Sequence, residues 1–186
     1  MIQETVARVC AIPVAFRRDP DATVRSLLEA CVRGAKPESL GEVARVLATR
    51  ISETAETEED LKPWLPQAVE TVRQVVASRM WTEASSSKEW HAEAPFAAEI
   101  RPGVLLSGRI DLAYLSPEGW VLVDYKTERL EEDLDAQAAS HRDQLALYAE
   151  AWGRGTGKPV AKAGIFFTRR GDPVEWVIPA GNPSPS

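Results

Sequence analysis

Residues 108–127, GRIDLAYLSPEGWVLVDYKT, decide the fold of this chain, because two runs of alternating residues flank a turn. The turn is Ser-Pro-Glu-Gly at residues 116–119, and proline at its second position suits a β-turn. A two-residue loop at this point sets the register of the strands on either side. We therefore predict an antiparallel hairpin with strands over residues 104–115 and 119–127.

The register of this hairpin sorts its charged and apolar residues onto different faces. A two-residue loop pairs Ser116 with Gly119. Continuing the register places Asp111 directly opposite Asp124, and Lys126 projects from the same side. The opposite face is predicted to be wholly apolar, with Ile110, Leu112, Tyr114, Val121, Val123 and Tyr125.

Two carboxylates on one side of a hairpin favour a metal site. Asp111 and Asp124 repel each other unless a raised pKa, a cation or a metal relieves the charge. Mg²⁺ takes one or two carboxylates together with waters and phosphate oxygens, and Lys126 is placed to polarise a water or stabilise a phosphate. This set suits phosphodiester hydrolysis. The same residues also fit a salt-bridged surface face neutralised by Arg109 and Lys126, and a three-residue loop would separate the aspartates.

The remaining pattern changes from helical spacing to strand alternation near residue 90. Helical elements are expected before this point, over residues 2–11, from Asp21, from Ser39 and over 61–83, with an acidic stretch over 53–60. Strands are expected over residues 91–100 and 161–168 in addition to the hairpin, with a helix over 130–152 and another strand over 174–178. We predict an α/β domain: a mixed sheet with helices on both sides, a helical N-terminal annex over 1–90, a core over 91–180 and a tail over 181–186.

Composition limits the classes of protein. The net charge of −6 argues against a domain that grips DNA by charge alone. Cys10 and Cys31 make no zinc motif and cannot hold an iron–sulfur cluster by themselves, so buried free thiols are expected. No apolar run reaches the length of a membrane span and no signal peptide is evident, so we expect a cytoplasmic protein. No Walker motif of an ATP-driven motor occurs.

Three short motifs, in order along the chain, resemble those of the PD-(D/E)XK nuclease superfamily. The closest resemblance is to its RecB-like branch, and there to the nuclease domain at the C-terminus of AddA-type helicase–nucleases. The likeness covers roughly residues 90–170. The motifs are GRIDL at 108–112, VDYKT at 123–127 and QLALY at 144–148, preceded by EAPF at 93–96.

The resemblance implies a role for each matching residue and a restriction-endonuclease-like sheet flanked by helices. Asp111 and Asp124 match the metal-binding aspartates of the family, and the backbone carbonyl of Tyr125 matches a further metal ligand. Lys126 matches the catalytic lysine. Two residues on the following helix match a pair that assists DNA handling and catalysis, and helical spacing puts them on one face: Gln144 and Tyr148.

The function implied by the resemblance is a Mg²⁺- or Mn²⁺-dependent DNA nuclease, and exonuclease action is expected. The expected partners are single-stranded DNA and a helicase portion or partner subunit, in double-strand break repair and recombination. The alternative is a catalytically inactive nuclease-like module that binds DNA or protein. An unrelated domain with a salt-bridged hairpin is a third possibility.

The chain departs from the family pattern in one respect. Relatives carry a metal-binding histidine on an early helix, whereas this chain has only His91, on the strand before the hairpin, and His141, near Gln144. The cluster-binding cysteines of some branches are also missing. Further candidates left open are an added carboxylate and several phosphate contacts: Glu70, Glu83, Glu93, Arg109, Arg142, Arg169 and Arg170.

Overall fold

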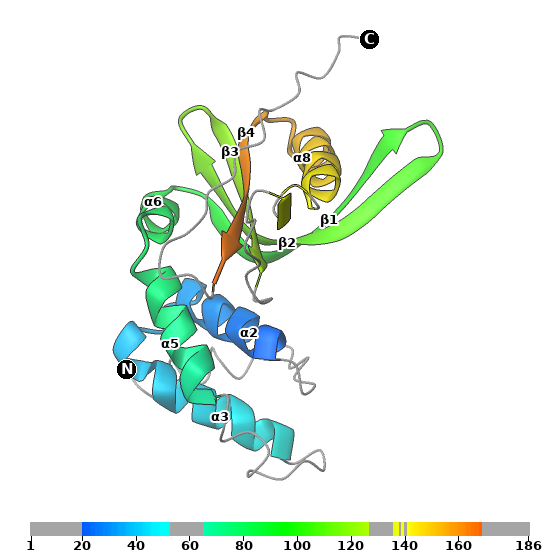
Figure 1. The fold of residues 1–186 in the computed structure, drawn as a ribbon. Helices are drawn as coiled ribbons and strands as arrows, with labels where there is room; N and C mark the ends of the chain where they lie inside the picture. The colour runs from blue at the N-terminus through cyan, green and yellow to red at the C-terminus, as the bar shows by residue number, and fades with distance from the viewer. Residues whose placement is uncertain (1–19, 53–64, 127–135, 138, 140, 169–186) are drawn as a thin grey trace. The chain divides into compact units, whose positions relative to one another are not determined.

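The structure, a computed structural model, describes residues 20–52, 65–126, 136–137, 139 and 141–168 (Figure 1). The chain divides into two compact units, Met1–Thr82 and Glu83–Ser186. The predicted elements over residues 2–11 and 174–178 and the acidic stretch over 53–60 lie outside the described residues.

The first unit is helical, as the spacing of its apolar residues predicts. It contains α2 (Pro20–Val32), the 3-10 helix η1 (Pro37–Ser39), α3 (Leu40–Ser52) and α5 (Leu65–Val76), and α6 (Arg79–Ser86) runs across the boundary between the units. Helix α2 packs against both α3 and α5. Its core is formed by fully buried aliphatic side chains, among them Leu27, Leu40, Val72 and Val75.

The single long helix predicted over residues 61–83 is wrong. Within the described part of that range the chain forms two helices, α5 and α6, separated at Ala77 and Ser78. The Ser78 side chain accepts a hydrogen bond from the backbone N–H of Trp81 at 3.2 Å. A serine that satisfies a first-turn N–H in this way begins a new helix rather than continuing the old one.

The second unit holds a four-stranded mixed sheet in the order β1-β2-β3-β4 (Figure 1). Its strands are β1 (Trp90–Arg101), β2 (Val104–Ser116), β3 (Gly119–Lys126) and β4 (Val160–Phe167). The first three strands are antiparallel neighbours, whereas β3 and β4 are parallel. A parallel pair needs a crossover, and helix α8 (Arg142–Thr156) lies in that connection. The predicted mixed α/β fold is confirmed.

The turn of the β2–β3 hairpin has the predicted two-residue geometry, with Ser116 paired to Gly119. Gly119 has a φ of +137°, and a Cβ there would lie 2.5 Å from the carbonyl oxygen of Pro159. That close approach lets the next residue, Trp120, donate its backbone N–H to the same oxygen at 2.9 Å. The glycine therefore joins the start of β3 to the chain that enters β4.

Helix α8 covers the side of the sheet on which the aspartates were expected. Ala113 and Leu122 are fully buried there, and the Trp120 ring lies 5.3 Å from the Trp152 ring of α8 in an edge-on arrangement. The prediction of one apolar face and one charged face is therefore wrong for the middle of the hairpin. Residues on both faces are buried, as is usual for a strand beside a parallel neighbour.

Within the described helices, none is both long enough and apolar enough to cross a membrane.

Candidate active site

The ladder between β2 and β3 ends one residue before the two aspartates. Its last pair in the described chain is Leu112 with Val123, although the register would next bring Asp111 opposite Asp124. Instead, the buried Asp111 carboxylate accepts a hydrogen bond from the backbone N–H of Tyr125, with an Oδ2–N distance of 2.7 Å. A side chain thus takes the place of a ladder bond, and the Asp111 carboxylate lies between the two strands.

Asp124 and Lys126, the residues on either side of Tyr125, form a shielded ion pair. Asp124 Oδ2 lies 2.8 Å from Lys126 Nζ, and the two side chains are 16% and 19% exposed. The contact lacks hydrogen-bond geometry, and no other group in the described part of the chain donates to this buried oxygen. The Lys126 ammonium is therefore the cation that this buried oxygen faces in the structure.

The predicted pair on the following helix is also assembled. Gln144 Nε2 donates a hydrogen bond to the hydroxyl oxygen of Tyr148 at 3.2 Å, across one turn of α8. The Tyr148 ring packs edge-on against the Phe96 ring of β1, with 4.9 Å between centroids. The phenol is therefore fixed by a hydrogen bond at one end and by an aromatic contact along its ring.

Gly108 makes this packing possible and was missed as a site residue from sequence. A Cβ on Gly108 would lie 2.8 Å from Phe96 Cζ and 3.1 Å from Tyr148 Cζ. A side chain at this position would therefore displace the two rings. The sequence signal for it was the glycine at the start of the GRIDL motif, three residues before Asp111.

Several other candidate residues serve in local contacts. Glu93 is 14% exposed and pairs with the exposed Arg109 at 3.5 Å. Tyr114 donates its hydroxyl to Glu83 at 3.3 Å, and in the first unit Glu70 lies 3.7 Å from a neighbouring arginine on α5. The exposed Arg142 begins α8, while Arg169 and Arg170 lie outside the described residues.

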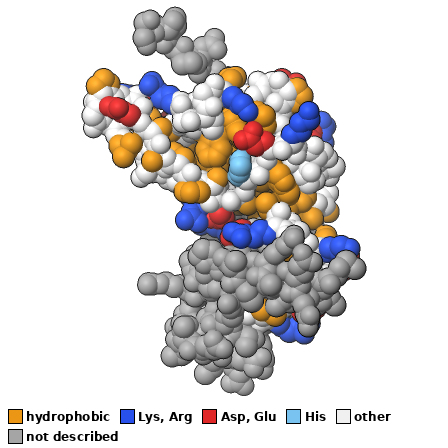
Figure 2. All heavy atoms as spheres, turned by 180° about the vertical axis from the view of Figure 1, so that it is seen from behind, with side chains coloured by type: hydrophobic (Ala, Val, Ile, Leu, Met, Phe, Trp, Pro, Cys, Tyr) orange, Lys and Arg blue, Asp and Glu red, His pale blue; other side chains and the backbone are white. Residues whose placement is uncertain are grey.

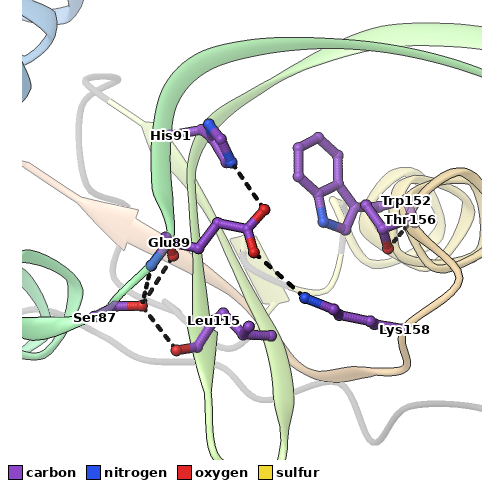
Figure 3. A network of polar contacts seen from close by, with 7 residues as sticks. All are labelled: Ser87, Glu89, His91, Leu115, Trp152, Thr156 and Lys158. Atoms are coloured by element: carbon purple, nitrogen blue, oxygen red, sulfur yellow. Dashed lines mark hydrogen bonds and ion pairs between the residues drawn. The ribbon is translucent and has the colours of Figure 1, made fainter.

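The two histidines do not join Asp111 and Asp124. His91 Nε2 lies 3.6 Å from Glu89 Oε1, in a surface network in which Glu89 also pairs with Lys158 at 3.3 Å (Figure 3). His141 precedes the first turn of α8. Among the described residues, no three histidine, cysteine, aspartate or glutamate side chains gather as a metal-binding group.

Comparison with protein families gives a match over most of the chain. The family model described as the PD-(D/E)XK nuclease superfamily matches residues 22–180. Among solved structures, one described as the crystal structure of SSO0001 aligns with 86% of this chain and 77% of its own, at 16% identity and a TM-score of 0.40. That score is too low to add to the assignment.

Three curated relatives share one description, as the same subunit of an ATP-dependent helicase/nuclease. The protein from Carboxydothermus hydrogenoformans is 28% identical over 109 residues, which is 52% of this chain and 9% of the relative. The protein from Desulforudis audaxviator is 38% identical over 90 residues, which is 41% of this chain and 7% of the relative. The protein from Limosilactobacillus reuteri subsp. reuteri is 33% identical over 102 residues, which is 45% of this chain and 7% of the relative. The chain thus spans less than a tenth of the length of these relatives.

Proposed function

Because the chain belongs to the PD-(D/E)XK nuclease superfamily, we propose that it is a nuclease domain that hydrolyses DNA phosphodiester bonds with Mg²⁺ or Mn²⁺. The observation that carries this proposal is the set of Asp111, Asp124 and Lys126 where the β2–β3 ladder ends. Two carboxylates and a lysine, partly shielded from water, are suited to a reaction that develops charge on a phosphate.

The residues at this point fit a divalent cation. Nucleases of this superfamily generally use divalent metals, and hard cations prefer carboxylate and carbonyl oxygens. Asp124 Oδ2 is buried and faces the Lys126 ammonium, which a metal bound at this oxygen would displace toward the substrate. The N–H and the carbonyl of one strand residue point to the same side, so the N–H bond from Tyr125 to Asp111 indicates that the Tyr125 carbonyl also faces Asp111. Asp111, Asp124 and this carbonyl would hold the metal.

Each protein group then has a separate task. A bound divalent metal supplies Lewis-acid activation and neutralises charge on the scissile phosphate. The Tyr125 N–H holds the Asp111 carboxylate in one orientation. Lys126, two residues after Asp124 and already in contact with it, is placed to donate a hydrogen bond from its ammonium group to the attacking water or to a phosphate oxygen. In the proposed reaction, water attacks phosphorus and releases a proton to solvent, while the bond to the leaving oxygen breaks and that oxygen takes up a proton from solvent.

The DNA strand would be held beside helix α8 and delivered by a motor protein. Gln144 and Tyr148 present polar groups on a fixed helix face next to β1. On the face seen in Figure 2, basic and acidic side chains of the described residues are interspersed without a continuous basic stripe, and the net charge is −6. A domain with this charge needs help to retain DNA. Because its relatives are helicase/nuclease subunits, we propose single-stranded DNA from a helicase as substrate, exonuclease action, and a role in double-strand break repair.

Cleavage of end-labelled single-stranded DNA tests this function. We expect wild-type protein to cleave only with Mg²⁺ or Mn²⁺ and Lys126→Ala to lose on the order of 100-fold or more in rate. Lys162→Ala is the matched control, because Lys162 is an exposed lysine on the neighbouring strand β4. Cleavage by neither protein would reject a nuclease function and leave a binding module, whereas equal rates of cleavage by both would show that the reaction does not use Lys126 and would reject this site.

A further inference from the structure

The side chains of strand β1 change faces partway along the strand. His91 lies on the α8 side, where its ring is 6.5 Å from the Trp152 ring (Figure 3). Phe96 also lies on the α8 side, where its ring is 4.9 Å from the Tyr148 ring. These two β1 residues are five positions apart, and in a regular strand an odd separation puts side chains on opposite faces. The alternation of β1 is therefore interrupted between them.

Strand β2 changes faces at the matching place. Ala113 is the ladder partner of His91, and Gly108 is the ladder partner of Phe96. Directly opposite residues share a face of the sheet, so Ala113 and Gly108 both face α8 although they too are five positions apart. The Cβ direction of Gly108 points at Phe96, which agrees with this assignment. The interruption thus crosses both strands.

The interruption lies at Glu93 and Asp111. These two residues face each other in the register and have regular pairs on both sides, yet they form no pair of the described β1–β2 ladder. Of all the non-glycine residues that the structure describes, only Glu93 has a positive φ, at +50°. A left-handed residue within a strand bends the strand and changes which way the following side chains point. Glu93 therefore forms a kink in the sheet opposite Asp111.

The kink coincides with the unusual position of Asp111. The side chain of Asp111 leaves the regular alternation of β2 and reaches the edge of β3, where it accepts the N–H of Tyr125. We propose that the left-handed backbone of Glu93, and not its carboxylate, places Asp111 beside Asp124 and Lys126. This inference rests on the proposed function of that site, and it makes Glu93 a positioning residue.

One contact of the Glu93 carboxylate is a long ion pair. Its Oε2 lies 3.5 Å from the Nη1 atom of Arg109, whose side chain is 61% exposed. Exposed ion pairs at such distances add little to stability. Because positive φ is costly for a residue with a Cβ, this ion pair alone does not account for the backbone conformation of Glu93.

Four substitutions separate the backbone of Glu93 from its side chain. Glu93→Gly and Glu93→Asn remove the carboxylate and adopt positive φ readily. Glu93→Val removes the carboxylate and strongly disfavours positive φ, because valine is β-branched. Ala97→Val is the matched control, since it puts the same side chain at an exposed, regularly paired position of β1.

Two measurements are made on each variant. The first is the amide proton shift and hydrogen-exchange protection of Tyr125 by NMR without metal or DNA, which report its hydrogen bond to Asp111. The second is the single-turnover rate of DNA cleavage. We expect Glu93→Gly, Glu93→Asn and Ala97→Val to keep the wild-type amide signal and rate. We expect Glu93→Val to lose the hydrogen-exchange protection of the Tyr125 amide and to cleave DNA about 100-fold more slowly, because a displaced Asp111 carboxylate would no longer be in the productive geometry.

The outcomes separate this inference from the proposed function. Loss of the Tyr125 signal or of cleavage in both Glu93→Gly and Glu93→Asn would overturn the inference, because the carboxylate would then be the required group. Full retention of both in a folded Glu93→Val would overturn it as well. If Glu93→Val does not fold, the glycine and asparagine variants still decide. If wild-type protein cleaves no DNA, the proposed function fails, whereas the Tyr125 amide still tests whether Glu93 positions Asp111.

Discussion

Replacing Gly108 with alanine adds one methyl group between two aromatic rings. The new Cβ would lie 2.8 Å from Phe96 Cζ and 3.1 Å from Tyr148 Cζ, so at least one ring must move. Overpacking of this kind costs about 1–3 kcal/mol, whereas the lower entropy of alanine in the unfolded chain returns about 0.4–1 kcal/mol. At the middle of both ranges, the expected net loss in the free energy of unfolding is about 1.3 kcal/mol. For a chain of this length that lowers Tm by about 3–5 °C.

Thermal unfolding followed by circular dichroism measures this loss, with Gly155→Ala as the control. A Cβ on Gly155 would meet no heavy atom within 4 Å in the described chain, so this helix substitution should stabilise by up to about 1 kcal/mol. The two glycine-to-alanine changes are therefore expected to shift Tm in opposite directions. In a Phe96→Leu background the loss from Gly108→Ala should shrink, because the smaller side chain leaves room for the methyl group. A Tm at or above the wild-type value for Gly108→Ala, or an equal loss in both backgrounds, would refute the reasoning.

Two further predictions concern Asp111 and Cys31. Asp111→Asn keeps an acceptor for the Tyr125 N–H, so its urea midpoint should match wild type, while its Mn²⁺ affinity measured by calorimetry should fall at least about tenfold. Asp111→Ala should also lose about 1–3 kcal/mol of stability, because the Tyr125 N–H is left without an acceptor. Equal stability of the two variants would contradict the role of this hydrogen bond. Burial raises the pKa of the Cys31 thiol to about 12. In a Cys10→Ser background Cys31 should therefore resist iodoacetamide at pH 8 until the protein unfolds, and rapid labelling of folded protein would show that the thiol is accessible. Because the unfolded chain loses the thiol proton from about pH 9.0 and the folded chain keeps it, stability should fall as the pH rises above 9.0.

The hairpin could be predicted from sequence because several local signals agree. The turn at residues 116–119 and the apolar alternation on either side favour one register, and the structure has that register from Ser116–Gly119 to Leu112–Val123. The contact of Lys126 with Asp124 follows from their separation by two residues in a strand. These features depend on neighbours in the sequence, which is why they could be inferred without coordinates.

The departure of Asp111 from the ladder could not be predicted, because it depends on a distant residue. Glutamate carries no preference for positive φ, so nothing in the residue type marks Glu93 as the position of a kink. The burial of Ala113 and Leu122 under α8 also depends on tertiary packing, because the same strand alternation occurs in a sheet with one face exposed to solvent. The break at Ser78 had a local signal, because a serine three residues before Trp81 can cap a new helix. The helical spacing of the apolar residues on both sides nevertheless favoured one continuous helix.

The kink at Glu93 also marks where the outer part of the β1–β2 hairpin, which does not pair with β3, begins. Beyond it the two strands continue to the turn at Pro102 and Gly103 without pairing to β3 (Figure 1), and β1 packs against α8 through Ala98 and Ile100. Residues added at that turn would extend the hairpin without altering the register of β2 against β3. The turn is therefore a suitable insertion point for a fluorophore or an epitope tag, which would allow DNA engagement to be followed without a label at the aspartates.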